Sequence, residues 1–261
     1  MRSLSIAATG MQAQQLNVDV ISNNIANLST TSFKRQRAEF QDLLYQNIER
    51  TGTISSDNGN VVPTGIQIGT GVKPGAVYRI HEQGNVVRTG NELDVAIQGE
   101  GYFQVELPNG DPAYIRAGAF QINNQGQVVT AEGYLVSPNI TIPDDAISIS
   151  INQSGEVRVK FSDQAPEQLV GQFDLVRFQN EAGLQALGNN LYQETEASGA
   201  PIVSTAGQPG YGTILQNYLE TSNVDVVTEL TTLITAQRSY ELNSRVISTS
   251  DEMLQTLSQL S

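Results

Sequence analysis

The two ends of the chain share a spacing of apolar positions that the middle lacks. In residues 3–30, apolar side chains recur every seven residues at two heptad positions. The first position holds Leu4, Met11, Val18 and Ile25. The second, three residues further on, holds Ala7, Ile21 and Leu28 and is interrupted by Gln14. The C-terminal segment repeats this spacing with Val226, Leu233, Tyr240, Ile247 and Leu254, widened by Leu230, Ile234 and Leu257. Heptad spacing is typical of helices that pair in coiled coils. We expect helices over 3–30 and about 224–260, the second capped by Ser222 and broken near 248–250.

Between these ends, short runs rich in β-branched and aromatic residues replace the heptads. The runs 147–151 and 157–161 alternate apolar and polar residues around the turn sequence 152–155, which predicts a hairpin. Similar runs cover 93–97, 102–107, 113–122, 128–136 and 169–178. The predicted class is α+β: long N- and C-terminal helices paired as a coiled-coil-like domain, with a mainly antiparallel, barrel- or sandwich-like β domain inserted between them.

These patterns divide the chain into three regions. Residues 1–32 with 222–261 are expected to form a discontinuous helical assembly domain, and 76–196 a β-rich outer domain. Residues 33–75 and 197–221 are expected to form an extended connecting region. A lone amphipathic helix is marginal in water, and each seam residue gains about 1.5–3 kcal/mol only when a partner buries it. That partner is either another chain, which the near-continuous heptads favour, or the β domain of the same chain.

Composition narrows the classes of function. The 261 residues carry 14 Lys and Arg against 27 Asp and Glu, a formal charge of −13, which disfavours sequence-independent nucleic-acid binding and attraction to anionic membranes. The absence of cysteine excludes disulfides, thiolate metal sites and cysteine nucleophiles. No apolar run reaches the ~18–20 residues of a membrane span, and the first twelve residues are too polar for a secretory signal. We expect a soluble protein without direct membrane insertion.

Candidate catalytic chemistry is sparse. The single histidine, His81, has no nucleophile nearby in the sequence and excludes a two-histidine zinc site. The adjacent acids Asp144 and Asp145 are typical of a solvated turn. The basic cluster 34–37 is expected to neutralise the end of the first helix or to pair with Glu39 and Asp42. We therefore expect no catalysis, no cofactor and no metal.

A segment near the N-terminus carries a family signature. Residues 22–34, SNNIANLSTTSFK, strongly resemble the N-terminal signature of the bacterial flagellar rod and hook family of axial proteins. Further segments resemble the distal-rod branch of this family in order and spacing: 1–11, 38–46, 65–72, 93–103, 219–225 and 236–241. The resemblance spans essentially the whole chain, which makes it more specific than any single motif.

The resemblance implies a structural subunit of the distal rod that catalyses no reaction. In this family the terminal helices pair as an inner coiled-coil domain of a rigid hollow tube, which transmits motor torque to the hook and forms part of the export channel. The implied partners are further copies of the chain, proximal rod proteins and hook protein along the axis, and P-ring and L-ring proteins around it. Family members leave the cytoplasm through the flagellar type III export apparatus without signal cleavage, and the distal rod spans the periplasm.

The resemblance also assigns roles to particular residues. The stretch 46–72 resembles a rod-type segment associated with a stiff tube, and its motif residues are Gly65, Ile66, Ile68, Gly69 and Gly71. The signature residues are Asn23, Asn24, Asn27, Phe33 and Lys34. We expect the three asparagines to satisfy backbone and neighbouring amides where the first helix ends. The apolar heptad positions of both helices are expected to pack within and between subunits.

One residue departs from the family pattern. Ser32 stands where the family usually has glycine before Phe33 and Lys34. If this position needs a positive φ, serine there carries a modest strain of up to about 1–2 kcal/mol.

Two alternative functions remain open. The first is another axial protein of the same family, from the proximal rod or the hook, against which the segment 46–72 argues. The second, from a different class, is a secreted β-domain glycan-binding or hydrolytic protein, which would need convergent acids in a cleft and no self-assembly.

Overall fold

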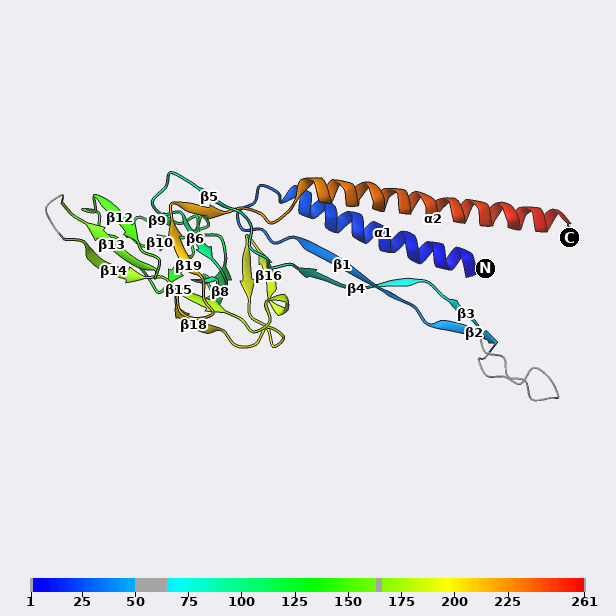
Figure 1. Ribbon diagram of the computed structural model, residues 1–261, viewed down its shortest axis with the longest axis horizontal. Coiled ribbons are helices and arrows are strands. Elements are labelled where there is room, and N and C mark those ends of the chain that lie inside the picture. Colours follow the sequence, from blue (N-terminus) through cyan, green and yellow to red (C-terminus); the bar gives the residue numbers. More distant parts are fainter. Residues whose placement is uncertain (1, 50–64, 163–165, 261) are drawn as a thin grey trace. The chain divides into compact units, whose positions relative to one another are not determined.

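The computed structural model describes residues 2–49, 65–162 and 166–260 (Figure 1). The chain divides into two units by its internal contacts. The first, which we call the helical unit, consists of Met1–Ala26, Gln36–Arg79 and Asp225–Ser261. The second, which we call the β unit, consists of Asn27–Arg35 and Ile80–Val224.

The helical unit contains two helices and two strand pairs. Helices α1 (Arg2–Ala26) and α2 (Val226–Leu260) run antiparallel (Figure 1). Strand β1 (Gln36–Asp42) pairs with β4 (Val72–Arg79), and β2 (Tyr45–Glu49) pairs with β3 (Ile66–Gly69). α1 lies between α2 and the β1–β4 pair, and its Thr9 Oγ1 accepts a hydrogen bond from Val72 N at 3.3 Å. The strands β1 to β4 occupy much of the stretch expected to be an extended connection.

The start of α2 differs from the prediction. Ser222 does not cap the helix; its hydroxyl accepts a hydrogen bond from Val224 N at 3.3 Å, before the helix begins. Asp225 takes the capping role, because its Oδ1 accepts a hydrogen bond from Thr228 N at 2.8 Å. The hydrogen bonds from Thr228 lower the pKa of the Asp225 carboxyl. A carboxylate at this position also suits the positive end of the helix dipole.

The lengths of both helices also differ from the prediction. α1 ends at Ala26 rather than at residue 30, and turns follow it. The predicted break in α2 near 248–250 is wrong, since the helix continues to Leu260. Ser248 and Thr249 donate their hydroxyl hydrogens to carbonyls one turn earlier, which satisfies both groups without ending the helix.

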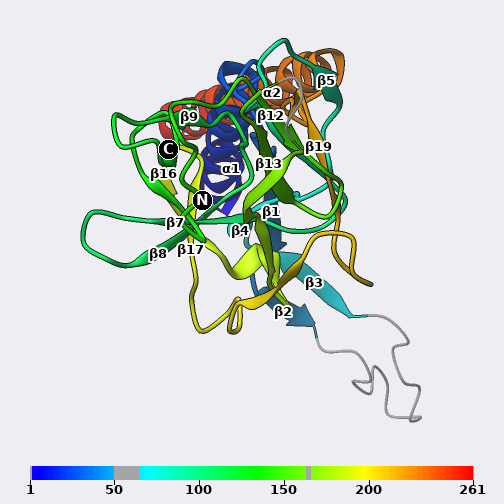
Figure 2. The same cartoon turned by 90° about the vertical axis from the view of Figure 1, so that its left-hand side faces the viewer.

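The β unit is built from antiparallel strands. Its main sheet has the order β16–β17–β8–β7–β11–β10–β9, and Figure 2 shows β17, β8 and β7 side by side. In chain order its strands are Phe103–Glu106 (β7), Pro112–Ile115 (β8), Gln121–Ile122 (β9), Val128–Val129 (β10), Leu135–Ser137 (β11), Gln185–Gly188 (β16) and Leu191–Gln193 (β17).

Smaller sheets complete the β unit. A three-stranded sheet contains β12 (Ser148–Ile151), β13 (Glu156–Lys160) and β14 (Gln168–Gln172). The two-stranded pairs are β15 (Asp174–Arg177) with β18 (Ile202–Thr205), β6 (Val95–Gln98) with β19 (Thr213–Gln216), and β5 (Val86–Arg88) with β20 (Tyr218–Glu220). The short 3₁₀ helix η1 spans Glu181–Gly183. The predicted α+β class, with paired terminal helices and an inserted antiparallel β region, is confirmed.

The predicted hairpin forms, but two longer predicted strands are broken. In the hairpin, Ile149 pairs with Val159 and Ile151 with Val157. The run 113–122 splits into β8 and β9, because the backbone at Gly118 turns against β6. There Val95 N donates to Gly118 O at 2.9 Å, and a Cβ at Gly118 would lie 1.7 Å from Val95 O. A side chain at this position would therefore prevent the two backbones from meeting.

The core of the β unit is aliphatic with an aromatic centre. Phe103, Phe120 and Phe173 are each at most 1% exposed, and their ring centroids are 5.2, 5.7 and 5.6 Å apart. Rings at these spacings add edge-on and offset contacts to the burial of apolar area. Phe173 also separates β14 from β15, so the predicted run 169–178 forms two strands of different sheets.

Candidate functional site

The contact between α1 and α2 is formed in layers by small and polar residues. Ser250 Oγ donates to Ser3 Oγ at 3.3 Å, and Asn24 Nδ2 donates to Glu229 Oε2 at 3.2 Å. Between these layers Gly10 lies against Asn243, where a Cβ on the glycine would come within 2.9 Å of Asn243 Nδ2. On each helix these residues are seven or fourteen positions apart, so they form one continuous seam.

The apolar heptad residues of α2 lie beside this seam. Leu233, Ile247 and Leu254 are half-buried, as is Val226, whereas Tyr240 is 43% exposed. Leu230 and Ile234 are 45% and 51% exposed, and the side chain of Leu257 lies outside the described residues. The intramolecular pair therefore leaves much of the apolar surface of α2 uncovered.

The predicted apolar stripe of α1 is divided between its two neighbours. The residues at the first heptad position are all half-buried: Leu4, Met11, Val18 and Ile25. At the second position Ala7 and Ile21 are buried, whereas Leu28 lies beyond the end of the helix. Ala13 and Val20 are also buried. The pattern underestimated how many sides of α1 are covered, because α2 and the β1–β4 pair cover different faces.

Asn24 joins α1 to both of its neighbours. Its side-chain oxygen accepts a hydrogen bond from Gln36 N at 2.8 Å, and its amide nitrogen donates to Gln36 O at 2.9 Å and to Glu229. Asn24 is 1% exposed, so these partners replace water for a buried amide. Asn23 is exposed, and Asn27 Oδ1 accepts from Thr30 Oγ1 at 3.1 Å in the turn after the helix. A role for the three asparagines in assembly stays a prediction.

The rod-type segment lies only partly within the described residues. Residues 50–64 are outside them, so the prediction for the middle of 46–72 is not described. Ile66 and Ile68 lie in β3, with Ile66 48% exposed, and Gly69 lies against the Tyr45 ring. Gly65 precedes β3, and Gly71, whose φ is +133°, lies against Thr9 of α1.

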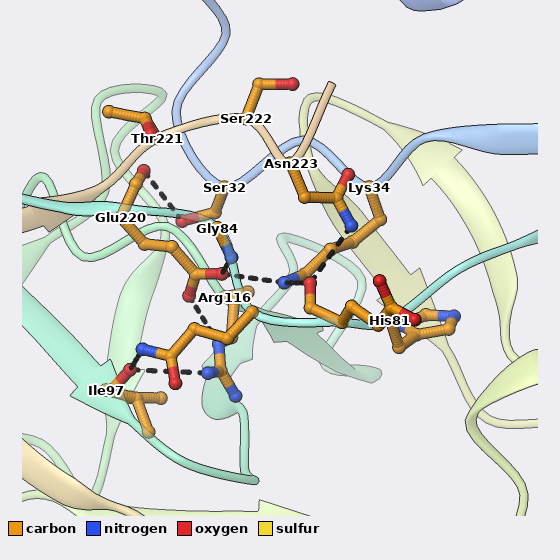
Figure 3. A network of polar contacts seen from close by, with 12 residues as sticks. Ser32, Lys34, His81, Gly84, Ile97, Arg116, Glu220, Thr221, Ser222 and Asn223 are labelled. Atoms are coloured by element: carbon orange, nitrogen blue, oxygen red, sulfur yellow. Dashed lines mark hydrogen bonds and ion pairs between the residues drawn. The ribbon is translucent and has the colours of Figure 1, made fainter. Parts of the chain in front are cut away.

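A buried ion cluster in the β unit involves the signature residue Lys34. Lys34 Nζ lies 2.7 Å from Glu220 Oε1, and Arg116 Nε lies 2.8 Å from Glu220 Oε2 (Figure 3). Lys34 and Glu220 are each 2% exposed, and Arg116 is 6% exposed. Gly84 N also donates to Glu220 Oε1 at 2.9 Å. The expectation that Lys34 neutralises a helix end or pairs with Glu39 or Asp42 is therefore wrong.

The remaining donors of the cluster are directed at backbone carbonyls. Lys34 Nζ donates to Glu82 O at 2.8 Å, and Arg116 donates to Gly101 O at 2.6 Å, to Ile97 O at 3.3 Å and to Gly99 O. Such complete pairing is what a buried charge requires. Two cations face one carboxylate, so Glu220 is held as the anion.

Burial and pairing act in opposite directions on the pKa values of the cluster. Burial alone would raise the pKa of Glu220, but Arg116 and Lys34 outweigh it and hold the pKa below its ordinary value. For Lys34 burial is the larger effect, and the pKa lies below its ordinary value despite the pairing with Glu220.

Next to the cluster, Asn223 and Ser32 fix the chain segments at the border of the β unit. Asn223 Oδ1 accepts from Arg35 N at 2.7 Å, and its amide nitrogen donates to Ile80 O at 2.9 Å and Glu82 O at 3.0 Å. Ser32 has a φ of 56° and donates its N–H to Glu220 O at 2.9 Å. The positive φ that the glycine of the family pattern suggested is present, and serine adopts it.

A cavity of about 420 Å³ beside the cluster contains the candidate histidine. His81 Nδ1 lies 2.7 Å from Tyr102 Oη and 3.9 Å from Glu181 Oε2. Burial raises the pKa of Glu181. Within residues 2–49, 65–162 and 166–260, no His, Cys, Asp or Glu residues cluster as a metal site would require. None of the helices in the same ranges is long and apolar enough to cross a membrane.

Sequence reasoning missed Arg116 and Glu220. A signal for Arg116 was available, because it is the one charged residue in the strand-like run 113–122. A charge inside an apolar run predicts a buried partner of opposite sign. The sequence holds no comparable signal for which acid would be that partner, since Glu220 is more than a hundred residues away.

Comparison with known proteins gives matches along the whole chain. The family described as flagella basal body rod protein matches residues 4–34, the flagellar hook protein FlgE/F/G D1 domain matches 96–159, and the flagellar basal body rod FlgEFG protein C-terminal region matches 215–260. The chain is 61% identical over 260 residues to flagellar basal-body rod protein FlgG of Caulobacter vibrioides, covering 100% of this chain and 99% of the relative. It is 53% identical over 259 residues to FlgG of Agrobacterium fabrum and 52% identical over 258 residues to FlgG of Buchnera aphidicola, covering 99% of each chain. The chain therefore belongs to the FlgG family of flagellar basal-body rod proteins, and it is a structural subunit of the distal rod.

Proposed function

We propose that this rod subunit assembles with further copies of itself through α1 and α2, as the inner part of a rigid hollow tube. The tube transmits motor torque to the hook and forms part of the export channel. In this proposal residues 1–32 and 222–261 act as the assembly domain, 76–196 as the outer domain, and 33–75 with 197–221 as the connection, including the rod-type segment 46–72.

The observation that carries this proposal is the uncovered apolar surface of α2. Val227 is 73% exposed, Leu242 61% and Met253 55%, whereas the seam with α1 buries Glu229, Ala236 and Ser250. Exposed patches of large apolar side chains usually mark interaction sites. A helix that buries polar groups and exposes leucine and methionine is suited to a second partner beyond α1.

The proposed partners follow from the family. Within the basal body the rod subunit adjoins other rod and hook components. We propose proximal rod proteins and hook protein as its axial neighbours, P-ring and L-ring proteins around it, and delivery by the flagellar type III export apparatus without signal cleavage.

Replacing one exposed leucine of α2 by a charge tests the proposal. Leu242→Asp places a charge in the proposed contact, and we expect rods to be absent from basal bodies of cells in which this variant is the only rod subunit of its type. Electron microscopy of purified basal bodies gives the readout.

Ser248→Asp is the matched control, because it adds the same charge at an exposed polar position of the same helix. It should leave rods intact, and circular dichroism should show both purified variants folded. Rods of normal length and number with Leu242→Asp would contradict the proposal.

A further inference from the structure

Helix α2 carries two apolar patches outside its seam with α1. The N-half patch consists of Val227, Leu230 and Ile234, which are 73%, 45% and 51% exposed. The C-half patch consists of Leu242, Val246 and Met253, which are 61%, 46% and 55% exposed. With 3.6 residues per turn, the N-half patch is centred roughly 140° to one side of the seam and the C-half patch roughly 70° to the other. The two patches therefore lie on different flanks of the helix, one on each side of the seam.

Each flank is apolar in one half of the helix only. The flank of the N-half patch continues toward the C-terminus with polar residues: Glu241, Ser244, Ser248, Asp251 and Gln255. The flank of the C-half patch carries polar residues in the N-terminal half: Thr228, Thr232, Thr235 and Ser239. If two such helices lay parallel at the same level, with the flank of the N-half patch on one facing the flank of the C-half patch on the other, each apolar patch would contact polar side chains. The hydroxyls of Thr232, Thr235, Ser239 and Ser248 donate to backbone carbonyls of the helix, but the exposed carboxylates Glu241 and Asp251 would lose water against the C-half patch. Burying such charges against apolar side chains is unfavourable, so this unshifted arrangement is disfavoured.

A groove continues the surface of the N-half patch. It has a volume of about 400 Å³ and is lined by Gln15 and Val18 of α1 and by Gln237, Tyr240 and Glu241 of α2. Gln237 and Glu241 follow Leu230 and Ile234 at intervals of seven residues, on the same flank. This flank therefore offers a recess whose lining includes the apolar Val18 and the Tyr240 ring, next to three exposed aliphatic side chains.

Resting on the proposed self-assembly, we propose that the N-half patch and its groove bind the C-half patch of a second copy of this chain. The helices of the two copies lie parallel and are shifted along their axes. Leu230 and Val246 are the middle members of the patches, and a rise of 1.5 Å per residue gives a shift of about 24 Å. Each copy offers both surfaces, so the contact is heterologous. Such contacts repeat into an open helical polymer when their rotation does not close a ring.

Cysteine crosslinking tests this contact directly, because the natural chain has no cysteine. The double variant Leu230→Cys/Val246→Cys is expressed as the only copy, basal bodies are purified, and a short bifunctional maleimide is added. We expect a ladder of covalent dimers, trimers and longer species on a denaturing gel. Either single variant alone should stay monomeric, and co-expression of the two single variants should give dimers without higher species.

The matched control places cysteines on the exposed face away from both flanks. Thr231→Cys/Arg245→Cys has a similar separation along α2, and both positions are exposed. It should give no ladder. Dimers from Leu230→Cys alone would indicate a self-complementary contact and would overturn the proposal, as would rods of the double variant that give no ladder.

The shift provides a second test that needs no substitution. In rods of the unsubstituted chain resolved by electron cryomicroscopy, laterally adjacent copies of α2 should be displaced by about 24 Å along the helix. Contact between like patches, or between helices at the same level, would overturn the inference while leaving self-assembly intact. Failure of the unsubstituted chain to form rods would overturn the proposed function and this inference with it.

Discussion

At the scale of single residues, Ser32 shows a strained position next to a charged cluster. Its φ of 56° lies in the left-handed region, which costs a residue with a Cβ roughly 1–2 kcal/mol. Its hydroxyl recovers little, because the Ser32 Oγ to Glu220 O distance is 3.5 Å. The sequence identified this position through the glycine that the family has there, although only the structure gives the sign of φ.

Ser32→Gly should therefore stabilise the protein. We expect a gain of about 0.5–1 kcal/mol in the free energy of unfolding, since the relieved strain exceeds the extra chain entropy of glycine. Urea unfolding of the purified chain, followed by circular dichroism, measures the change. Ser32→Ala keeps the strain and should show no gain; equal stability of the two variants would contradict the assignment of strain.

Glu220 is the residue whose loss should cost most in the ion cluster. Glu220→Gln leaves Lys34 and Arg116 buried without their counter-charge, and we expect a loss of about 3–5 kcal/mol in unfolding free energy at pH 7. The folded pKa of Glu220 is depressed, so its stabilisation is present above its ordinary pKa of 4.5 and is lost as the pH falls through the folded value.

Urea unfolding at pH 7 and at more acidic pH measures this dependence. The difference between the natural chain and Glu220→Gln should shrink on acidification. Glu156→Gln is the control, because it removes an exposed pair with Arg158 at 2.8 Å and should change stability by less than about 1 kcal/mol. A pH-independent loss with Glu220→Gln would contradict the role of the carboxylate charge.

At the scale of elements, the heptads predicted the helices well and their contacts less well. Apolar spacing located α1 and α2, and the family resemblance added that they pair; their antiparallel direction comes from the structure. Apolar spacing did not show that Ser3, Gly10 and Asn24 form the seam, because close approach of helices is favoured by small side chains that a search for apolar residues ignores. The sequence pattern also misplaced the ends of the helices. For example, Asp225 caps α2, whereas Ser222 was predicted to do so.

The strands show a similar limit. Alternation around 152–155 predicted a hairpin, which the structure confirms, and the structure adds the register by pairing Ile149 with Val159 and Ile151 with Val157. The run 113–122 was predicted as one element, and Gly118 divides it where the backbone meets Val95. Such close approaches depend on a partner distant in sequence, which local pattern does not report. The pairing of Lys34 with Glu220 could not be predicted for the same reason, because the two residues are far apart in the sequence.

At the scale of the whole molecule, α1 and α2 pair with each other within one chain and leave an apolar surface of α2 exposed. Its intramolecular contact uses serine, glycine, asparagine and glutamate, and the leucine, valine and methionine side chains of α2 stay accessible. This division leaves on α2 the apolar surface that the proposed contact between copies would bury. Membership of a flagellar rod family agrees with that division of labour.

The most direct test of this account is the structure of the assembled rod by electron cryomicroscopy, with this chain as the subunit. The account predicts that α1 and α2 keep their antiparallel seam and that Val227, Leu242 and Met253 become buried between neighbouring copies. A rod in which these three side chains remain in solvent, with subunits joined only through their β units, would contradict it.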